Sequence, residues 1–367
     1  MDYHIFFLYL FVFFGFFIYT TKDNEVNIMI KIVVDAFGGD NAPNEVVSGV
    51  VSAINSNEKL HIILTGKEEV LMEVLSGYKY NDSQISIIDA REVISNNESA
   101  TEAIRQKKDS SLVKALDCAK EDDEVVGIIS AGSTGAVLTG AFMKLGRMKG
   151  VLRPALCPII PTAQGTITSI CDCGANVDCK PEYLHQFAIM GNAYLKVLGV
   201  KNPRVALLNV GTEDHKGDVR SKETFELLKN SSSKINFVGN MEARDLLSGD
   251  YDLVVTDGFA GNVLLKSTEG AIKNLLTIMK NEIKASFFSK IGALFMKKTF
   301  KNIKKGFDYS NHGGAVLLGC KKLVVKSHGS STAKNFLTCI NQVVTMAEGK
   351  LVENISKSLE KVEMSNE

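Results

Sequence analysis

The side chains best suited to chemistry lie between Asp172 and Lys180. Within this short segment, Asp172 and Asp178 supply carboxylates, Asn176 supplies an amide and Lys180 supplies an amine. Side chains of these types can orient an anionic substrate, exchange protons or balance charge that develops during a reaction. We therefore predict catalytic roles for Asp172, Asn176 and Lys180.

The pattern around this segment predicts a strand, a polar turn and a helix. Ile167–Ile170 favours a β-strand, and the apolar residues after Pro181 recur at helical spacing. Pro181 suits a first helical turn because its missing N–H would be unpaired there. In open α/β sheets, ligands bind at the carboxyl ends of strands, where helix N-termini direct free N–H groups outward. This turn is therefore predicted to lie at a ligand site.

Other predicted strands end in the same kind of turn. Each is an apolar run followed by Gly with Asp, Asn, Ser or Thr, and the runs are Ile30–Val34, Val125–Ile129, Val205–Val210 and Leu253–Thr256. A helical pattern follows each turn. This repetition predicts a largely parallel sheet with flanking helices and one ligand cleft along its C-terminal edge.

These turns supply the remaining candidate residues. His215 and Asp257 join the catalytic candidates. The candidates for binding substrate or phosphate are Gly38, Gly39, Asp40, Asn41, Ser130, Gly132, Ser133, Thr134, Gly135, Asn209, Lys216, Gly258, Asn262, His328 and Gly329. The turn 130–135 resembles an anion cradle, although its spacing matches neither a P-loop nor a dinucleotide fingerprint. Its small residues also suit tight strand–helix packing, and each polar candidate could instead cap a turn or a helix.

Composition narrows the class of protein. A chain of 367 residues with 45% hydrophobic content can bury a large core in one or two domains. Lys plus Arg and Asp plus Glu both number 42, so no overall charge favours nucleic acid as a partner. The seven cysteines are an odd number, and three of them lie too close together for a disulfide framework. A reducing cytoplasm is therefore expected.

The two ends of the chain differ from its middle. Ile5–Tyr19 is an apolar and aromatic run that as a helix would span about 22 Å, which is short of a hydrocarbon core of roughly 30 Å. Residues 1–28 could be a marginal membrane anchor, a packed helix or a non-native extension upstream of Met29. We favour the last, because Met29 leads directly into a strand. Residues 29–350 are expected to form one domain, and 351–367 a charged, frayed tail.

Residues 280–305 form a basic amphipathic segment. Eight lysines interleave with aromatic and aliphatic residues, and Phe287, Ile291, Leu294 and Phe295 share one helical face. Such a helix can lie on an anionic membrane surface. It can equally pack on the body of the protein or on a second subunit.

Seven motifs stand in the order seen in one family. They are Asp35–Pro43, Ser130–Ala136, Arg153–Ala155, Asp172–Asn176, Asn209–Gly211, Thr256–Phe259 and Lys326–Gly329. From Met29 to the last helix the chain resembles the bacterial phosphate acyltransferases, which act on acyl-carrier-protein thioesters. Phe37 stands where Met is usual in this family, and Ser133 stands where Asn is expected.

The resemblance implies a fold, a reaction and partners. The implied fold is a three-layer α/β/α sandwich like those of isopropylmalate dehydrogenase and phosphate acetyltransferase. Inorganic phosphate and acyl-[acyl-carrier-protein] would give acyl phosphate and free carrier protein, without a cofactor or metal. Acyl phosphate would then feed a glycerol-3-phosphate acyltransferase in phospholipid synthesis. Family members are homodimers that associate peripherally with the membrane in the cytoplasm.

Positioning and electrostatics could be sufficient for this reaction, because a thiolate is already a good leaving group. Direct transfer is the leading mechanism, with Lys180, His215, Lys216 or His328 as cations or proton carriers and no base assigned. A covalent route through Cys171 or Cys173 lacks an evident activating base. Zinc binding by these cysteines and Cys179 lacks the paired spacing of structural sites.

Two other functions compete with this one. An NAD-dependent decarboxylating dehydrogenase of similar fold would need a metal-binding Asp cluster and a set of convergent Arg residues, and neither pattern is evident. A non-catalytic scaffold at the membrane would use residues 280–305 and the N-terminal run, but it leaves the polar strand ends unexplained.

Overall fold

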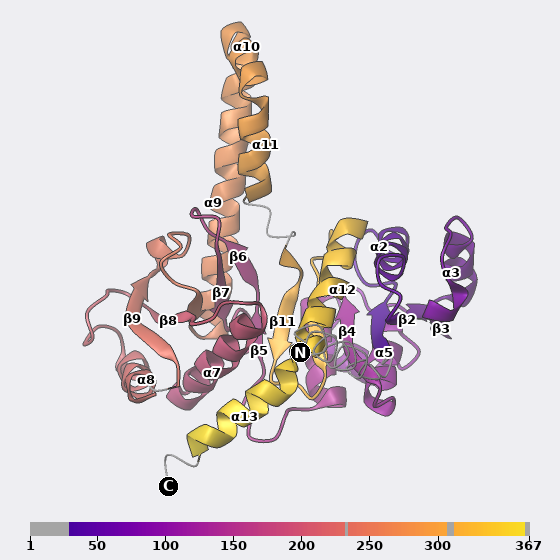
Figure 1. The fold of residues 1–367 in the computed structure, drawn as a ribbon, viewed down its shortest axis with the longest axis horizontal. Coiled ribbons are helices and arrows are strands. Elements are labelled where there is room, and N and C mark those ends of the chain that lie inside the picture. The colour runs from indigo at the N-terminus through magenta and orange to yellow at the C-terminus, as the bar shows by residue number, and fades with distance from the viewer. Residues whose placement is uncertain (1–28, 232–233, 307–311, 364–367) are drawn as a thin grey trace, which may run out of the picture.

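The protein is built around two β-sheets that carry helices on their faces (Figure 1). The computed structural model describes residues 29–231, 234–306 and 312–363. The N-terminal apolar run, for which three alternatives were open, lies outside the described residues. No helix among the described ranges is both long enough and apolar enough to cross a membrane.

The larger sheet has seven strands in the order β3-β2-β1-β4-β12-β11-β5. The strands from β3 to β12 are parallel, and β11 and β5 are antiparallel to their neighbours. Their bounds are β1 (Ile30–Asp35), β2 (Leu60–Gly66), β3 (Ile85–Asp89), β4 (Val125–Ser130), β5 (Ala155–Cys157), β11 (Ala315–Leu318) and β12 (Leu323–Lys326). The parallel strand ends predicted after residues 34 and 129 therefore lie side by side.

The smaller sheet has five strands in the order β6-β7-β10-β8-β9. Their bounds are β6 (Ile159–Pro161), β7 (Ile167–Cys171), β8 (Arg204–Asn209), β9 (Asn236–Glu242) and β10 (Leu253–Val255). The prediction of one sheet is corrected to two, because the chain changes sheet between β5 and β6. Pro158 is the residue between them, and proline has no N–H with which to continue a ladder.

Helices cover both sheets. They are α2 (Asn44–Ile54), α3 (Glu68–Leu75), α4 (Ala100–Gln106), α5 (Ser111–Glu121), α6 (Thr134–Gly140), α7 (Pro181–Val197), α8 (Val219–Asn230), α12 (Ala333–Glu348) and α13 (Leu351–Glu363), with short helical turns at Asp82–Gln84, Ala141–Leu145 and Ala243–Asp245. One apolar core runs through both sheets, with Phe187 and Tyr194 of α7 and Phe336 of α12 fully buried. A Tyr194 to Gln342 hydrogen bond of 2.7 Å joins α7 to α12.

The chain between residues 100 and 121 folds as two helices, α4 followed by α5, because Ser110 caps α5 by accepting a hydrogen bond from the Val113 N–H.

The prediction of a frayed tail is corrected to a helix for the described residues 351–363. Leu351, Ile355 and Leu359 are buried at helical spacing, so α13 packs on α7.

A helical arm projects from the body (Figure 1). α9 (Gly258–Ala285) runs outward from the smaller sheet, α10 (Phe287–Phe295) forms the tip, and α11 (Lys297–Gly306) returns beside α9. The basic segment predicted at 280–305 is therefore three helices, since Ser286 ends α9 and caps α10 through the Ser289 N–H. Its apolar face is not packed on the body, and Phe288 and Phe295 are 82% and 87% exposed.

Candidate functional site

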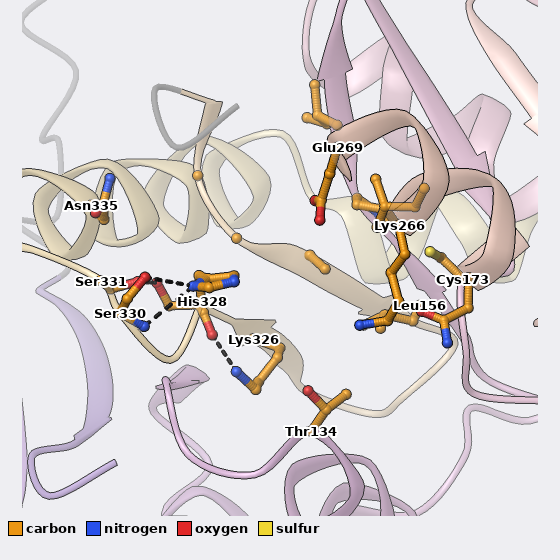
Figure 2. Close-up of a pocket in the computed structure, with 18 residues that line it drawn as sticks. Thr134, Leu156, Cys173, Lys266, Glu269, Lys326, His328, Ser330, Ser331 and Asn335 are labelled. Carbon is orange, nitrogen blue, oxygen red and sulfur yellow. Dashed lines mark hydrogen bonds between the residues drawn. The ribbon is translucent and has the colours of Figure 1, made fainter. Parts of the chain in front are cut away.

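A cavity of about 440 Å³ lies where the two sheets meet (Figure 2). Six parts of the chain form its walls: the β5–β6 link, the turn after β7, the first turns of α9, the segment that leads into β11, the β12–α12 turn and the start of α6. Its polar lining residues are Thr134, Asn262, Lys266, Glu269, Lys326, Ser327, His328, Ser330, Ser331 and Asn335. Parallel strands and helix starts thus converge on one polar hollow, which is the usual place for a ligand in an open α/β sheet.

Lys326 is the buried cation of this cavity. It is the last residue of β12, it is 9% exposed, and its Nζ donates hydrogen bonds to the carbonyl oxygens of Ala131 (3.4 Å) and Ser327. Burial lowers the pKa of Lys326 to about 8, while Asp35 and Asp40 act in the opposite direction. No carboxylate among the described residues forms a salt bridge with this ammonium. Its charge is therefore available to an anion entering the cavity.

Hydroxyls and an imidazole surround this lysine. Ser327 Oγ lies 2.7 Å from Ser331 Oγ, and the Ser330 N–H donates to Nδ1 of His328 over 3.2 Å. Because Nδ1 accepts this hydrogen bond, the proton of the neutral imidazole lies on Nε2. The wall can thus offer an ammonium, hydroxyls and an imidazole N–H to a ligand.

The opposite wall is the first part of α9 (Figure 2). Asn262, Lys266 and Glu269 follow one another at helical spacing and line the cavity. Burial raises the pKa of Glu269, and His328 and Lys266 oppose this shift. The sequence-based prediction stopped at Asn262. It missed Lys266 and Glu269, although their spacing from Asn262 within an expected helix was a usable signal.

The turns after β1, β4 and β12 are joined by hydrogen bonds. Ser130 Oγ donates to Asp35 over 2.6 Å, and Asp40 N–H donates to the Gly329 carbonyl over 2.7 Å. Asn41 Nδ2 lies 3.2 Å from the carbonyl oxygens of Ser330 and Ser331, which accept from it. Gly39 has φ +101°, so a side chain there would be strained. Gly38, Ser130 and Gly132 are close neighbours, while Ser133 and Gly135 begin α6 beside Thr134.

Asp172 does not line the cavity. Its side chain is fully buried, and its oxygens accept hydrogen bonds from the N–H groups of Leu156 (2.8 Å), Cys173 (2.7 Å) and Asn176 (2.6 Å). Burial raises the pKa of Asp172, while the Leu156 and Asn176 donors lower it. Asn176 Nδ2 in turn donates to the Pro154 carbonyl over 2.7 Å. The contacts of both residues shape the turn, and the catalytic roles expected for them stay predictions.

Asp257 and Lys180 also lie outside the cavity lining. Asp257 caps α9 by accepting from the Ala260 N–H (2.8 Å), and it pairs with Arg220 at 2.8 Å. The Gly258 N–H donates to the Asn176 carbonyl, so α9 starts on the turn after β7. Lys180 is an exposed residue immediately before α7.

The turn after β8 is separated from the cavity. β10 lies between β8 and β7 in the smaller sheet, so Asn209, His215 and Lys216 are displaced from the other turns. Asn209 Nδ2 donates to the Lys216 carbonyl over 3.1 Å. The turns after β4, β7 and β10 bring Thr134, Cys173 and Asn262 to the cavity lining, whereas the turn after β8 contributes no residue to it.

The cysteines do not have the properties of nucleophiles or metal ligands. Burial and the nearby Asp172 raise the pKa of Cys173, and burial likewise raises the pKa of Cys171. Both are therefore protonated thiols at neutral pH, which disfavours the covalent route. Cys179 joins neither in a metal-binding group, and no cluster of three or more His, Cys, Asp or Glu side chains occurs in the described ranges.

Comparisons with known proteins relate this chain to one protein family. A family model described as "Fatty acid synthesis protein" matches residues 30–354. The chain is 49% identical over 335 residues to the phosphate acyltransferase of Clostridium tetani (strain Massachusetts / E88), covering 91% of this chain and 99% of that protein. It is 48% identical over 332 residues to the phosphate acyltransferase of Clostridium acetobutylicum, covering 90% and 99%.

Solved structures of low sequence identity share the fold. A phosphotransacetylase from Streptococcus pyogenes aligns with a TM-score of 0.57 at 16% identity, covering 89% of this chain and 96% of that one. A branched-chain phosphotransacylase from Enterococcus faecalis V583 aligns with a TM-score of 0.53 at 15% identity, covering 86% and 98%. These matches confirm the predicted α/β sandwich.

The contacts of Asp172 predict a large loss of stability in Asp172→Asn. An asparagine keeps one acceptor oxygen and points an NH₂ group at the remaining N–H donors, so buried donors lose their partner. We expect the free energy of unfolding, measured in urea, to fall by about 2–4 kcal/mol. The exposed Asp178 supplies the control, since Asp178→Asn should change stability by less than about 0.5 kcal/mol. Equal unfolding midpoints for the two variants would contradict the assignment.

Proposed function

Because the chain belongs to the family of phosphate acyltransferases, we propose that it transfers the acyl group of acyl-[acyl-carrier-protein] to inorganic phosphate. The observation that supports phosphate as the acyl acceptor is the buried Lys326 in a polar cavity between the two sheets. A buried ammonium with hydroxyls around it suits a small dianion such as phosphate. Membership of this family makes the chain a transferase, so the dehydrogenase and the non-catalytic scaffold are both set aside.

In the proposed complex, phosphate occupies the end of the cavity near Lys326. Its ammonium and the hydroxyls of Ser327 and Ser331 hold the phosphate oxygens. The turn 130–135 contributes Thr134, whose backbone N–H and hydroxyl lie at the start of α6. Gly38–Asn41 and Gly329 contribute to the site by positioning its turns. Hydrogen bonds join the turn after β1, which contains Gly38–Asn41, to the β12–α12 turn, which contains Gly329, and these bonds fix the shape of the cavity floor.

The acyl thioester then lies between phosphate and α9. An oxygen of hydrogen phosphate attacks the thioester carbon, the C–S bond breaks, and the carrier thiolate leaves and takes up the proton that the phosphate group loses. Lys266 and the Nε2–H of His328 stabilise the negative charge on the carbonyl oxygen in the transition state. Deprotonated phosphate is already a nucleophile, so no general base is required. Asp172, Asn176 and Asp257 act as positioning residues. Lys180 and His215 were predicted to be catalytic, and Asn209 and Lys216 to bind substrate or phosphate. Because none of the four lines the cavity, we propose for them contact with the carrier protein.

The product, the cysteines and the exposed residues of the arm support proposals for the pathway, the compartment and the oligomeric state. Acyl phosphate is the acyl donor that we propose for glycerol-3-phosphate acylation in phospholipid synthesis. The cysteines in the described ranges are all free, which suits a reducing cytoplasm. The arm supports a homodimer, because Leu275 and Ile278 on α9 are each 59% exposed. Sedimentation equilibrium of the full chain measures that oligomeric state.

A direct assay tests the proposed reaction. The full chain is incubated with acyl-[acyl-carrier-protein] and phosphate, and acyl phosphate is trapped with hydroxylamine as the hydroxamate. We expect hydroxamate that depends on both substrates, with the coenzyme A thioester as a comparison donor. Absence of hydroxamate with every donor would refute the proposed reaction. Equal rates with the two donors would refute the carrier protein as the preferred donor.

The depressed pKa of Lys326 predicts a pH-dependent affinity for phosphate. Below pH about 8 this residue is an ammonium, and above it the residue becomes a neutral amine, so kcat/KM for phosphate should fall as pH rises through about 8. Lys326→Gln should lower kcat/KM about 10- to 100-fold and remove this limb, since one charged hydrogen-bond donor is lost. Lys326→Arg should retain activity without the limb, because arginine stays charged. The exposed Lys201, which does not line the cavity, supplies the control: an equal loss in Lys201→Gln would contradict the assignment.

The tip of the arm is the proposed membrane contact. Phe287, Phe288, Leu294 and Phe295 are each at least 72% exposed, and lysines flank them on α10 and α11. Exposed aromatic residues and nearby cations favour binding to the interface of an anionic bilayer. We expect the full chain to float with anionic vesicles, and Phe288→Asp with Phe295→Asp to abolish flotation without loss of activity in solution. Equal flotation of this double variant would contradict the proposal.

A further inference from the structure

A second cavity of about 1060 Å³ lies along the arm, between α9 and α11. Its apolar lining is Ile272, Leu276, Met279 and Ile283 from α9 with Phe300 and Ile303 from α11. The four α9 residues recur at helical spacing, so they form one continuous apolar stripe. None of these six side chains is fully buried, so the stripe is open to a ligand.

The two cavities are continuous. Lys266, Glu269, His328 and Ser330 line both the polar cavity between the sheets and this second cavity. A molecule whose reactive end lies near Lys326 therefore has an apolar path along α9 for the rest of its length. Lys273, Lys280 and Lys284 border this path, which keeps its edge cationic.

We propose that the groove between α9 and α11 binds the hydrocarbon chain of the acyl substrate and of the acyl phosphate product. This inference rests on the proposed function, because the reacting carbonyl must lie at the four shared residues. The volume is at the upper end of the roughly 300–1,000 Å³ typical of small-molecule sites. A long alkyl chain matches both the apolar lining and the polar mouth, and the lysines at the edge match the negative charge of acyl phosphate.

Binding can be measured without turnover, because the chain contains no tryptophan. Phe300→Trp places a single fluorophore in the groove, and Asn274→Trp places one on α9 at an exposed position that does not line the groove. Palmitate brominated near the end of its chain quenches tryptophan on contact. We expect saturable quenching in Phe300→Trp and at least fivefold less in Asn274→Trp. Equal quenching, or none in Phe300→Trp, overturns the proposal.

Chain-length dependence supplies the second test. Each methylene buried is worth about a fourfold change in affinity, so excluding the chain from the groove penalises long donors most. Leu276→Trp narrows the groove and should lower the ratio of kcat/KM for 16-carbon over 4-carbon thioesters at least tenfold. Asn274→Trp, on the same helix outside the groove, should leave this ratio unchanged. An unchanged ratio in Leu276→Trp overturns the proposal.

The outcomes separate this inference from the proposed function. If the unsubstituted chain forms no acyl phosphate from any thioester, the proposed reaction fails while quenching still reports on the groove. A different result would show the inference to be wrong while the reaction stands. In that case the chain is active, Leu276→Trp alters the oligomeric state measured by sedimentation, and the ratio of kcat/KM for 16-carbon over 4-carbon thioesters does not change. A second copy of the protein then occupies the groove.

Discussion

The carboxylate of Asp172 lies where the two sheets meet and accepts N–H groups from both sides of the junction. Leu156 donates from β5 in the larger sheet, and Cys173, Ala175 and Asn176 donate from the turn after β7 in the smaller one. The same turn accepts the Gly258 N–H at the start of α9, and the Gly261 Cα hydrogens lie against the Asp172 carbonyl so closely that a Cβ would clash at 2.0 Å. One buried acceptor thus sets the distance between the sheets and the place where the arm begins.

The polar cavity follows from that junction. α9 starts against the β7 turn, so its residues Lys266 and Glu269 face the β12–α12 turn with Lys326 and His328. The cavity combines the buried Lys326 with the half-buried Glu269, the exposed Lys266 and several hydroxyls. A buried charge such as that of Lys326 is costly unless a ligand or partner satisfies it. The same electrostatic environment that lowers the pKa of Lys326 makes its interaction with an anion stronger than it would be in water.

Sequence patterns predicted where the strands end better than they predicted the roles of the polar residues at those ends. The α/β class, α7 beginning at Pro181 and the polar turns after β4, β7 and β10 followed from local periodicity and turn chemistry. The break at Pro158 and the displacement of β8 depend on strand order, which a single sequence does not specify. Asp172 and Asp257 could not be distinguished from substrate-facing carboxylates, because their partners are backbone N–H groups and Arg220. Lys326 was missed because a lysine at a strand end is usually exposed.

The arm begins at the polar cavity and ends far from it. Its first turns carry Asn262, Lys266 and Glu269, and as a continuous helix of 28 residues α9 is about 42 Å long. A tilt of about 5° at its base would displace its far end by about 4 Å over that length. A partner bound at the aromatic tip would therefore restrict the angle of α9, and with it the positions of the α9 residues that line the cavity.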